Sequence, residues 1–296
     1  ETVRYRCLWI DEEGNESTSE WASVDDLQIK RTTSNDIFAA YLPPKFKLVT
    51  DAGVSDQAAS AYAGIVGKDT RSQEAYYTDL LIQVLSSMYY STTDSGERPL
   101  SWLKCILGPM DLAGALAYVS GDSEGPLMRL DSGYLESIAK GNVNHDDAVF
   151  EIRGVLIHEF THLVQKTVPY NNGDNMNYFA CIEGFADAVR CACGGVTDYN
   201  RRYVALNAGA YHDPNRTENG KFGPYVWQVP YGVSGYFMSW LRYYDGDFLR
   251  KLSQTMVSMK GDWSLENAVK YILGADADIQ KLWEEYIEDV KAENAQ

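Results

Sequence analysis

The sequence predicts an α+β fold with a small mixed sheet in its first half and a mostly helical C-terminal part. Short β-type runs separated by turn residues occupy the region before residue 131. Beyond residue 144, apolar residues recur instead at the spacing of helices. The chain has 296 residues, 45% of them hydrophobic and 12% aromatic, which is enough to build a buried core. We therefore expect a folded protein rather than a disordered one.

Residues 1–42 are predicted to form a β-rich N-terminal extension ahead of a larger domain over residues 43–296. Val3–Ile10 reads as one strand, and the acidic stretch 11–15 that follows reads as a turn. The pair Pro43-Pro44 interrupts regular structure and marks the boundary between the two parts.

The predicted sheet and its first helix follow the proline pair. We expect strands at residues 46–50, 103–107, 115–119 and 126–130. The last two flank Gly121–Gly125 and are predicted to form a hairpin. Its second strand is either a sheet edge to which an extended peptide can add, or an ordinary internal strand. Between residues 70 and 90, apolar side chains recur every four residues, which predicts a helix.

A long helix is predicted to begin near Asn144 and to end before Pro169. Acidic residues at positions 146 and 147 favour its positive N-terminal end. A polar loop over residues 170–177 separates it from a second helix at 179–193. The expected C-terminal helices lie at residues 231–245, 246–258, 264–273 and 276–293.

The most specific motif is His158-Glu159-Phe160-Thr161-His162, which has the form H-E-x-x-H. Two histidines four residues apart project from one face of a helix and can bind one Zn²⁺ ion. This motif is the signature of zincin metallopeptidases, so the fold is predicted to be zincin-like, with this helix carrying the active site. A catalytic zinc needs a third protein ligand and an open position for water. Glu183 is the predicted third ligand, and Asp187 is the alternative.

The remaining candidate residues take roles around that ion. Glu159 is the predicted general base, because it lies beside both histidines on the same helix. Asp187 is expected to hydrogen-bond the far nitrogen of His158 and fix its tautomer. Tyr231 is a candidate donor to the oxyanion, although with 21 tyrosines in the chain a packing role is the alternative.

The chain has two further histidines, which either belong to the same site or lie outside it. His145 is read as a residue of a helix start without a catalytic part. His212 lies in a predicted loop, where an exposed turn residue and a residue reaching the site are both open.

Composition excludes several other classes of protein. The formal net charge of −16 argues against binding to nucleic acid or to an anionic membrane. The sequence has no apolar run long enough to span a bilayer, so no membrane insertion is expected. Its five cysteines lack C-x-x-C spacing and predict neither a disulfide framework nor a structural zinc site.

Two stretches, residues 154–165 and 182–190, resemble the basic secretory protein family of plant and bacterial peptidases. Looser similarity extends over residues 46–50, 117–121 and 231–237. The resemblance implies a gluzincin-like, often secreted metallopeptidase with His158, His162 and Glu183 as ligands and Glu159 as base. This chain departs from the family in three ways. It is acidic, its loop between the two motifs is longer, and residues 1–42 have no counterpart.

The sequence thus predicts a zinc metallopeptidase of the cell exterior, secreted, periplasmic or on the cell surface. Its substrate would be a peptide or protein. Because the chain lacks the G-x-M-E-N motif of related aminopeptidases, we expect an endopeptidase. One alternative is a zinc-containing binding or adhesion module that presents residues 1–42 to a glycan or a protein. Another is an inactive relative whose cleft is plugged by its own loop around residues 170–180.

Overall fold

The structure is a computed structural model of the 296-residue chain. It describes residues 46–90, 103–110, 114–122, 125–168, 177–216 and 223–295, and before them Phe38 and four short strands. The chain divides into two compact units, Glu1–Asp36 and Ile37–Gln296. None of the helices in these described ranges is both long and apolar enough to cross a membrane. The division at residues 42 and 43 stays a prediction.

The first unit contains two small antiparallel strand pairs. β1 (Val3–Tyr5) pairs with β4 (Ala22–Val24), and β2 (Leu8–Ile10) pairs with β3 (Glu16–Thr18). Both β1 and β2 lie within the strand expected over Val3–Ile10, and positions 6 and 7 between them lie outside the described residues. The predicted turn at 11–15 lies outside the described residues.

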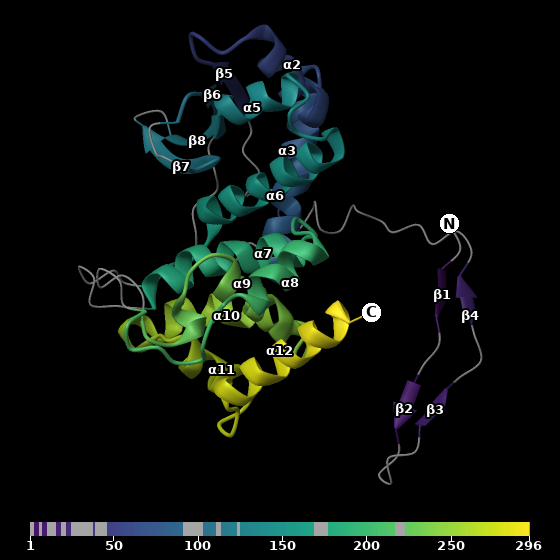
Figure 1. Ribbon diagram of the computed structural model, residues 1–296, viewed down its shortest axis with the longest axis vertical. Helices are drawn as coiled ribbons and strands as arrows, with labels where there is room; N and C mark the ends of the chain where they lie inside the picture. The colour runs from purple at the N-terminus through teal and green to yellow at the C-terminus, as the bar shows by residue number, and fades with distance from the viewer. Residues whose placement is uncertain are drawn as a thin grey trace. The chain divides into compact units, whose positions relative to one another are not determined.

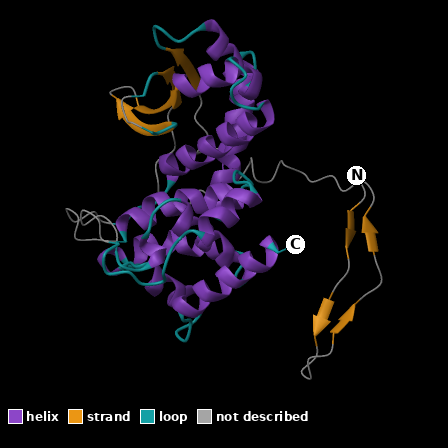
Figure 2. Cartoon of the chain, viewed as in Figure 1, coloured by secondary structure: helices purple, strands orange, loops and turns teal. Residues whose placement is uncertain are grey.

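The second unit carries a four-stranded mixed sheet in the order β5-β6-β8-β7 (Figures 1 and 2). β5 (Phe46–Thr50), β6 (Leu103–Gly108) and β8 (Gly125–Asp131) are parallel, and β7 (Ala117–Asp122) runs antiparallel to β8. The predicted hairpin of β7 and β8 is confirmed. β8 is bonded on both sides, so it is an internal strand and the edge-strand reading of residues 126–130 is wrong. The edge beside β8 is β7.

Three helices lie close to this sheet: α2 (Asp56–Val66), α3 (Thr70–Met88) and α5 (Ser132–Ala139). The helix expected between residues 70 and 90 is α3. One of its side chains, Tyr77, contacts the ring of Phe46 on β5 and the ring of Phe160 further along the chain. It also shares a 2.7 Å hydrogen bond with Tyr62 of α2. These aromatic contacts join the sheet to the helical layer that carries the H-E-x-x-H motif.

That motif lies within α6 (His145–Val164), which begins and ends where the sequence predicts. The Asn144 side chain accepts a hydrogen bond from the amide of Asp146, as an N-cap does. The helix expected over residues 179–193 is less regular. It is made of η2 (Ala180–Gly184), a π-helical turn, which runs directly into α7 (Phe185–Ala192).

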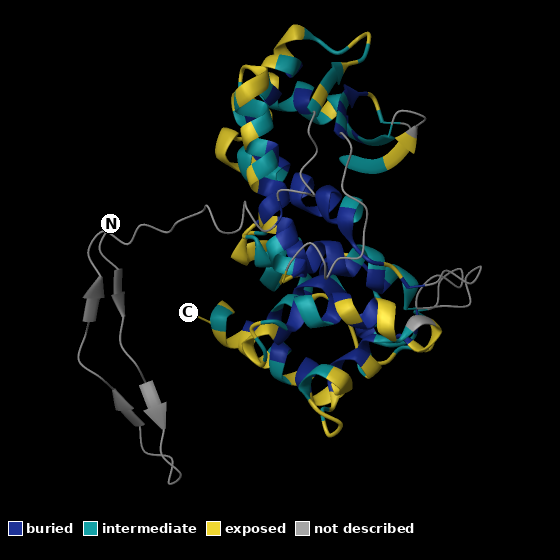
Figure 3. Cartoon of the chain, turned by 180° about the vertical axis from the view of Figure 1, so that it is seen from behind, coloured by how far each residue is buried: buried dark blue, intermediate teal, exposed yellow. Residues whose placement is uncertain are grey.

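The helices predicted beyond residue 230 are confirmed, and a helix that was not predicted from the sequence, α8 (Asp198–Leu206), precedes them. After α8 come η4 (Val226–Gln228), α9 (Gly232–Trp240), η5 (Leu241–Tyr243), α10 (Phe248–Ser258), η6 (Lys260–Asp262), α11 (Leu265–Leu273) and α12 (Ile279–Asn294). Rings of α9 and α12 pack together, with Phe237 and Trp283 centred 5.1 Å apart. Figure 3 shows the buried residues concentrated along the middle helices of this unit. The fold is α+β, mostly helical, with a small sheet.

Candidate metal centre

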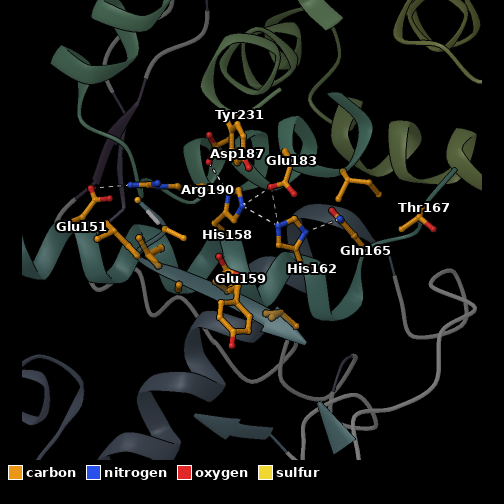
Figure 4. Close-up of a pocket in the computed structure, with 18 of the residues that line it drawn as sticks. Glu151, His158, Glu159, His162, Gln165, Thr167, Glu183, Asp187, Arg190 and Tyr231 are labelled. Atoms are coloured by element: carbon orange, nitrogen blue, oxygen red, sulfur yellow. Dashed lines mark hydrogen bonds and ion pairs between the residues drawn. The ribbon is translucent and has the colours of Figure 1, made fainter. Parts of the chain in front are cut away.

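A cleft of about 810 Å³ opens along one face of α6. One of its walls is the segment Gly114–Val119, which includes the start of the edge strand β7. Ile182 and Glu183 of η2 line it as well, as do Asp187 and Arg190 of α7. Figure 4 shows Glu183 and Asp187 directed at the histidines of α6, whereas Arg190 is directed at Glu151.

The side chains that α6 presents to the cleft follow its helical period. Glu151, Val155, His158 and His162 line the cleft at steps of three or four residues, and Glu159 is adjacent to this row. Such a stripe is what residues at i, i+4, i+7 and i+11 form on one side of an α-helix. The regularity of α6 therefore aims both imidazoles at one point.

Three donor atoms meet there. His158 Nε2 lies 3.0 Å from His162 Nε2, and Glu183 Oε2 lies 3.3 Å and 3.4 Å from these two nitrogens. Within the described ranges, this is the group of His, Cys, Asp and Glu side chains whose ligand atoms cluster closely enough for a metal ion. Asp187, the alternative third ligand, instead faces the other nitrogen of His158.

The size of this triangle fits zinc. Bonds of about 2.0–2.1 Å in a tetrahedral geometry separate neighbouring ligand atoms by about 3.3–3.4 Å. The observed separations of 3.0, 3.3 and 3.4 Å are close to that value. Two imidazole nitrogens and one carboxylate oxygen are also a donor set found in catalytic zinc sites.

Both ring nitrogens of His158 face carboxylates, Nε2 that of Glu183 and Nδ1 that of Asp187. Its Nδ1 lies 2.8 Å from Asp187 Oδ1, and both side chains are buried. Burial lowers the pKa of His158, but the hydrogen bonds to Asp187 and Glu183 outweigh this and raise the pKa to about 10. A carboxylate on Nδ1 holds the hydrogen on that nitrogen and leaves Nε2 directed at the other donors.

Glu183 owes its position to a close contact between helices. The neighbouring Gly184 lies against α9, where a Cβ atom would stand 2.1 Å from Ser234 Oγ. Gly235 of α9 in turn faces the carbonyl oxygen of Gly184, 2.6 Å from where its own Cβ would be. Burial raises the pKa of Glu183, but hydrogen bonds to His158 and His162 lower it to about 2. The carboxylate is thus ionised at any pH near neutrality.

Glu159 has the environment of a proton acceptor. Its side chain is buried, and Oε2 has no hydrogen-bond partner within the described part of the chain. Burial raises the pKa of Glu159, the nearby carboxylates of Glu183 and Asp187 raise it too, and the two histidines lower it. The net result is a pKa above the ordinary glutamate value, and hence a stronger base.

Tyr231 stands over the site in a strained backbone conformation. It has φ 61° and ψ −142°, and among the described residues it is the non-glycine residue with positive φ. Such backbone strain is concentrated at functional sites. The ring is nearly parallel to that of His158, with centroids 6.3 Å apart. Burial and the nearby carboxylates raise the pKa of Tyr231, so the phenol keeps its hydrogen and can donate it.

Two polar features of the cleft were not predicted from the sequence. Gln165 lies 2.9 Å from Nδ1 of His162, three residues further along the chain. At the other end of the cleft, Arg190 donates from Nη2 to Glu151 Oε2 at 3.0 Å and from Nε to the carbonyl of Gly195. Glu151 lies seven residues before His158, so the helical period alone could have identified it as a cleft residue.

The structure therefore brings together all six residues selected from the sequence, which are His158, Glu159, His162, Glu183, Asp187 and Tyr231. His145 is the first residue of α6, as expected of a helix-start residue. His212 is not among the residues lining the cleft and forms an isolated β-bridge with Tyr225. Of the predicted loop at 170–177, only Asn177 is among the described residues.

Comparison with models of known protein families identifies a relationship. A family model described as "BSP: Peptidase of plants and bacteria" matches residues 44–286, most of the chain. No curated protein and no solved structure matches it.

Proposed function

The chain belongs to this family of plant and bacterial peptidases, the basic secretory protein family, and from that premise we propose that it is a zinc-dependent peptidase with a zincin-like active site. The observation that carries the proposal is the triangle of His158 Nε2, His162 Nε2 and Glu183 Oε2, with separations of 3.0–3.4 Å. These three residues are the proposed metal ligands. Zinc in such a site supplies a Lewis acid that acidifies a water molecule and polarises a carbonyl group.

Glu159 is the proposed general base. Its unpartnered Oε2 and raised pKa suit a carboxylate that takes a proton from the attacking water and returns it to the departing amine. Tyr231 is the proposed donor to the oxyanion of the tetrahedral intermediate. In the view of Figure 4, Tyr231 and Glu159 lie on opposite sides of the two histidines, so the two groups can act on different faces of the substrate.

The proposed substrate is an extended peptide or protein segment that adds to β7. This strand forms the edge of the sheet, and its start lines the cleft beside Glu159 and His158. Backbone pairing along an edge strand holds a peptide irrespective of its sequence. It also allows the chain to continue in both directions, which supports cleavage within a chain rather than at its end.

Two further proposals concern the whole chain. The peptidase domain is residues 43–296, and the family match begins one residue later, at 44. Residues 1–42 are a separate extension. The enzyme acts outside the cytoplasm, as a secreted, periplasmic or cell-surface protein. Detection of the natural chain in the culture medium or periplasmic fraction of its host tests that location.

The central experiment compares the natural protein with Glu159→Gln. Metal content is measured first, and then digestion of a broad peptide library is followed by mass spectrometry, before and after chelation. We expect about one zinc per chain in both proteins. Cleavage by the natural protein should stop with chelation and return with zinc. In the variant it should fall by about 10²- to 10⁴-fold, the usual contribution of a general base.

The same measurements separate the alternatives. A zinc-containing binding module would hold the metal and cleave nothing, and Glu159→Gln would leave its ligand affinity unchanged. Glu159 argues against that function, because its buried Oε2 has no hydrogen-bond partner among the described residues and a purely structural site has no use for a base. Full zinc loading without cleavage of any library peptide would favour an inactive relative.

A further inference from the structure

Gln165 is the residue that follows α6, and its backbone is fixed there. Its amide donates to the carbonyl of Thr161 at 2.8 Å and ends the helix, and the residue is only 8% exposed. The carboxamide therefore has little freedom except to turn about its last side-chain bond. Such a turn of 180° exchanges Oε1 and Nε2 without changing the space they fill.

The contact of this carboxamide with His162 poses a question of donors and acceptors. Nε2 of Gln165 lies 2.9 Å from Nδ1 of His162, while Oε1 is buried without a hydrogen-bond partner in the described part of the chain. An amide nitrogen opposite Nδ1 suits a histidine whose hydrogen is on Nε2. A histidine that binds metal through Nε2 carries its hydrogen on Nδ1 instead and needs an acceptor there.

We propose that Gln165 is the positioning residue of His162, and that it presents Oε1 to the Nδ1 hydrogen when Nε2 of His162 binds zinc. This inference rests on the proposed function. It assigns the two ligand histidines separate partners: His158 Nδ1 faces the carboxylate of Asp187, and His162 Nδ1 faces the amide of Gln165. The half-turn gives the unpartnered oxygen a hydrogen to accept and removes a clash between two donors.

Substitutions at position 165 distinguish an acceptor from a space-filling residue. Gln165→Met keeps the length of the side chain and removes the acceptor, so zinc affinity should fall by about 10- to 100-fold. Gln165→Glu keeps an acceptor and cannot donate, so zinc should bind at least as tightly as to the natural protein. Gln73 of α3 provides the matched control, because it lies away from the cleft and its Nε2 also donates a hydrogen bond, to the carbonyl of Gly67 at 2.9 Å. Gln73→Met should leave zinc affinity unchanged.

The test uses Zn²⁺ alone and does not rely on activity. Dissociation constants are measured by competition with a chromophoric chelator, and folding is checked by circular dichroism. In parallel, ¹⁵N–¹H spectra of the zinc-loaded proteins report the imidazole tautomers, which is practical because the chain has four histidines. A slowly exchanging Nδ1 hydrogen of His162 should appear in the natural protein and in Gln165→Glu, and be lost in Gln165→Met.

The proposal is overturned if Gln165→Met binds zinc within twofold of the natural protein, or if Gln165→Glu is weakened as much as Gln165→Met. In both cases the natural protein still binds zinc, so the metal site on which the proposed function depends is not contradicted. If the natural protein itself fails to bind zinc, the proposed function fails and this inference fails with it.

Discussion

The two helical segments that supply the donor triangle are built in different ways. α6 is a regular, capped helix of 20 residues, and its period alone directs His158 and His162 to the same side. η2 is a single π-helical turn without a side-chain cap, and Glu183 depends on how closely this turn approaches α9. π-turns of this kind are frequent at functional sites. One half of the site is thus specified by local sequence and the other by tertiary packing.

The largest effect is expected when the ligand on the π-turn is removed. In Glu183→Ala, zinc should bind about 10²- to 10³-fold more weakly. The binding free energy of zinc in a structural site is about 10–16 kcal/mol, and divided among about four ligands it gives about 2.5–4 kcal/mol for each. The measurement is chelator competition at constant pH. If zinc affinity stays within tenfold of the natural value, Asp187 can replace Glu183 as ligand, and the proposal that the π-turn supplies the third ligand is wrong.

A smaller effect is expected when the outer partner of a histidine is removed. Asp187→Ala leaves all three donors in place but takes away the group that orients His158, so zinc affinity should fall by about 10- to 100-fold. Asp187→Asn serves as the companion variant, since its amide oxygen can still accept from Nδ1. It should recover part of the loss. Equal losses in the two variants would contradict an orienting hydrogen bond.

Zinc binding is also expected to release a proton from His158. The pKa of His158 is raised to about 10, so at pH 7.5 its imidazole carries a proton before zinc binds and must release it. We expect release of about one proton per zinc, whereas an ordinary imidazole with a pKa of about 6.5 would release about 0.1. Zinc affinity should accordingly keep rising with pH above 7.

Calorimetry in buffers of different ionisation enthalpy measures this number. In Asp187→Asn the released fraction should drop, because the carboxylate that raises the pKa of His158 is gone. Release near 0.1 proton from the natural protein would rule out the strong coupling between His158 and its two carboxylates.

The contact between the π-turn and α9 predicts a change in stability. Gly235→Ala places a methyl group 2.6 Å from the carbonyl oxygen of Gly184, so the two segments must separate. Such overpacking costs about 1–3 kcal/mol of unfolding free energy, measurable by chemical denaturation. Gly64→Ala in α2 is the matched control: nothing lies within 4 Å of its Cβ. It should be neutral or slightly stabilising. An equal change in unfolding free energy in the two variants would contradict a close contact between the π-turn and α9.

Much of the regular structure was predictable, because it depends on short-range signals. The start of α6 near Asn144, the placement of His158 and His162 on this one helix, and the C-terminal helices are confirmed, because local residue patterns specify them. The pairing of β7 with β8 was also predictable from the turn between them.

The features that sequence could not predict depend on contacts between distant segments. The order of the sheet puts β8 inside and β7 at the edge, and nothing in either strand decides that order. Residues 179–193 have the composition of one α-helix, and the π-turn arises where Gly184 meets Gly235 some fifty positions later. The contact between Gln165 and His162 was overlooked for another reason: its three-residue spacing is visible, but glutamine gives no chemical signal of its own.

The paired glycines at the π-turn and α9 also bear on how related sequences can be searched. A motif search for the two histidines and the glutamate finds the donors but says nothing about whether the two backbones can approach one another. A sequence with a bulkier residue at either position would have to hold its acidic ligand farther from the histidines. Glycine immediately after that ligand, together with a Ser-Gly pair in a downstream helix, is therefore a stricter query for this arrangement than the histidine motif alone.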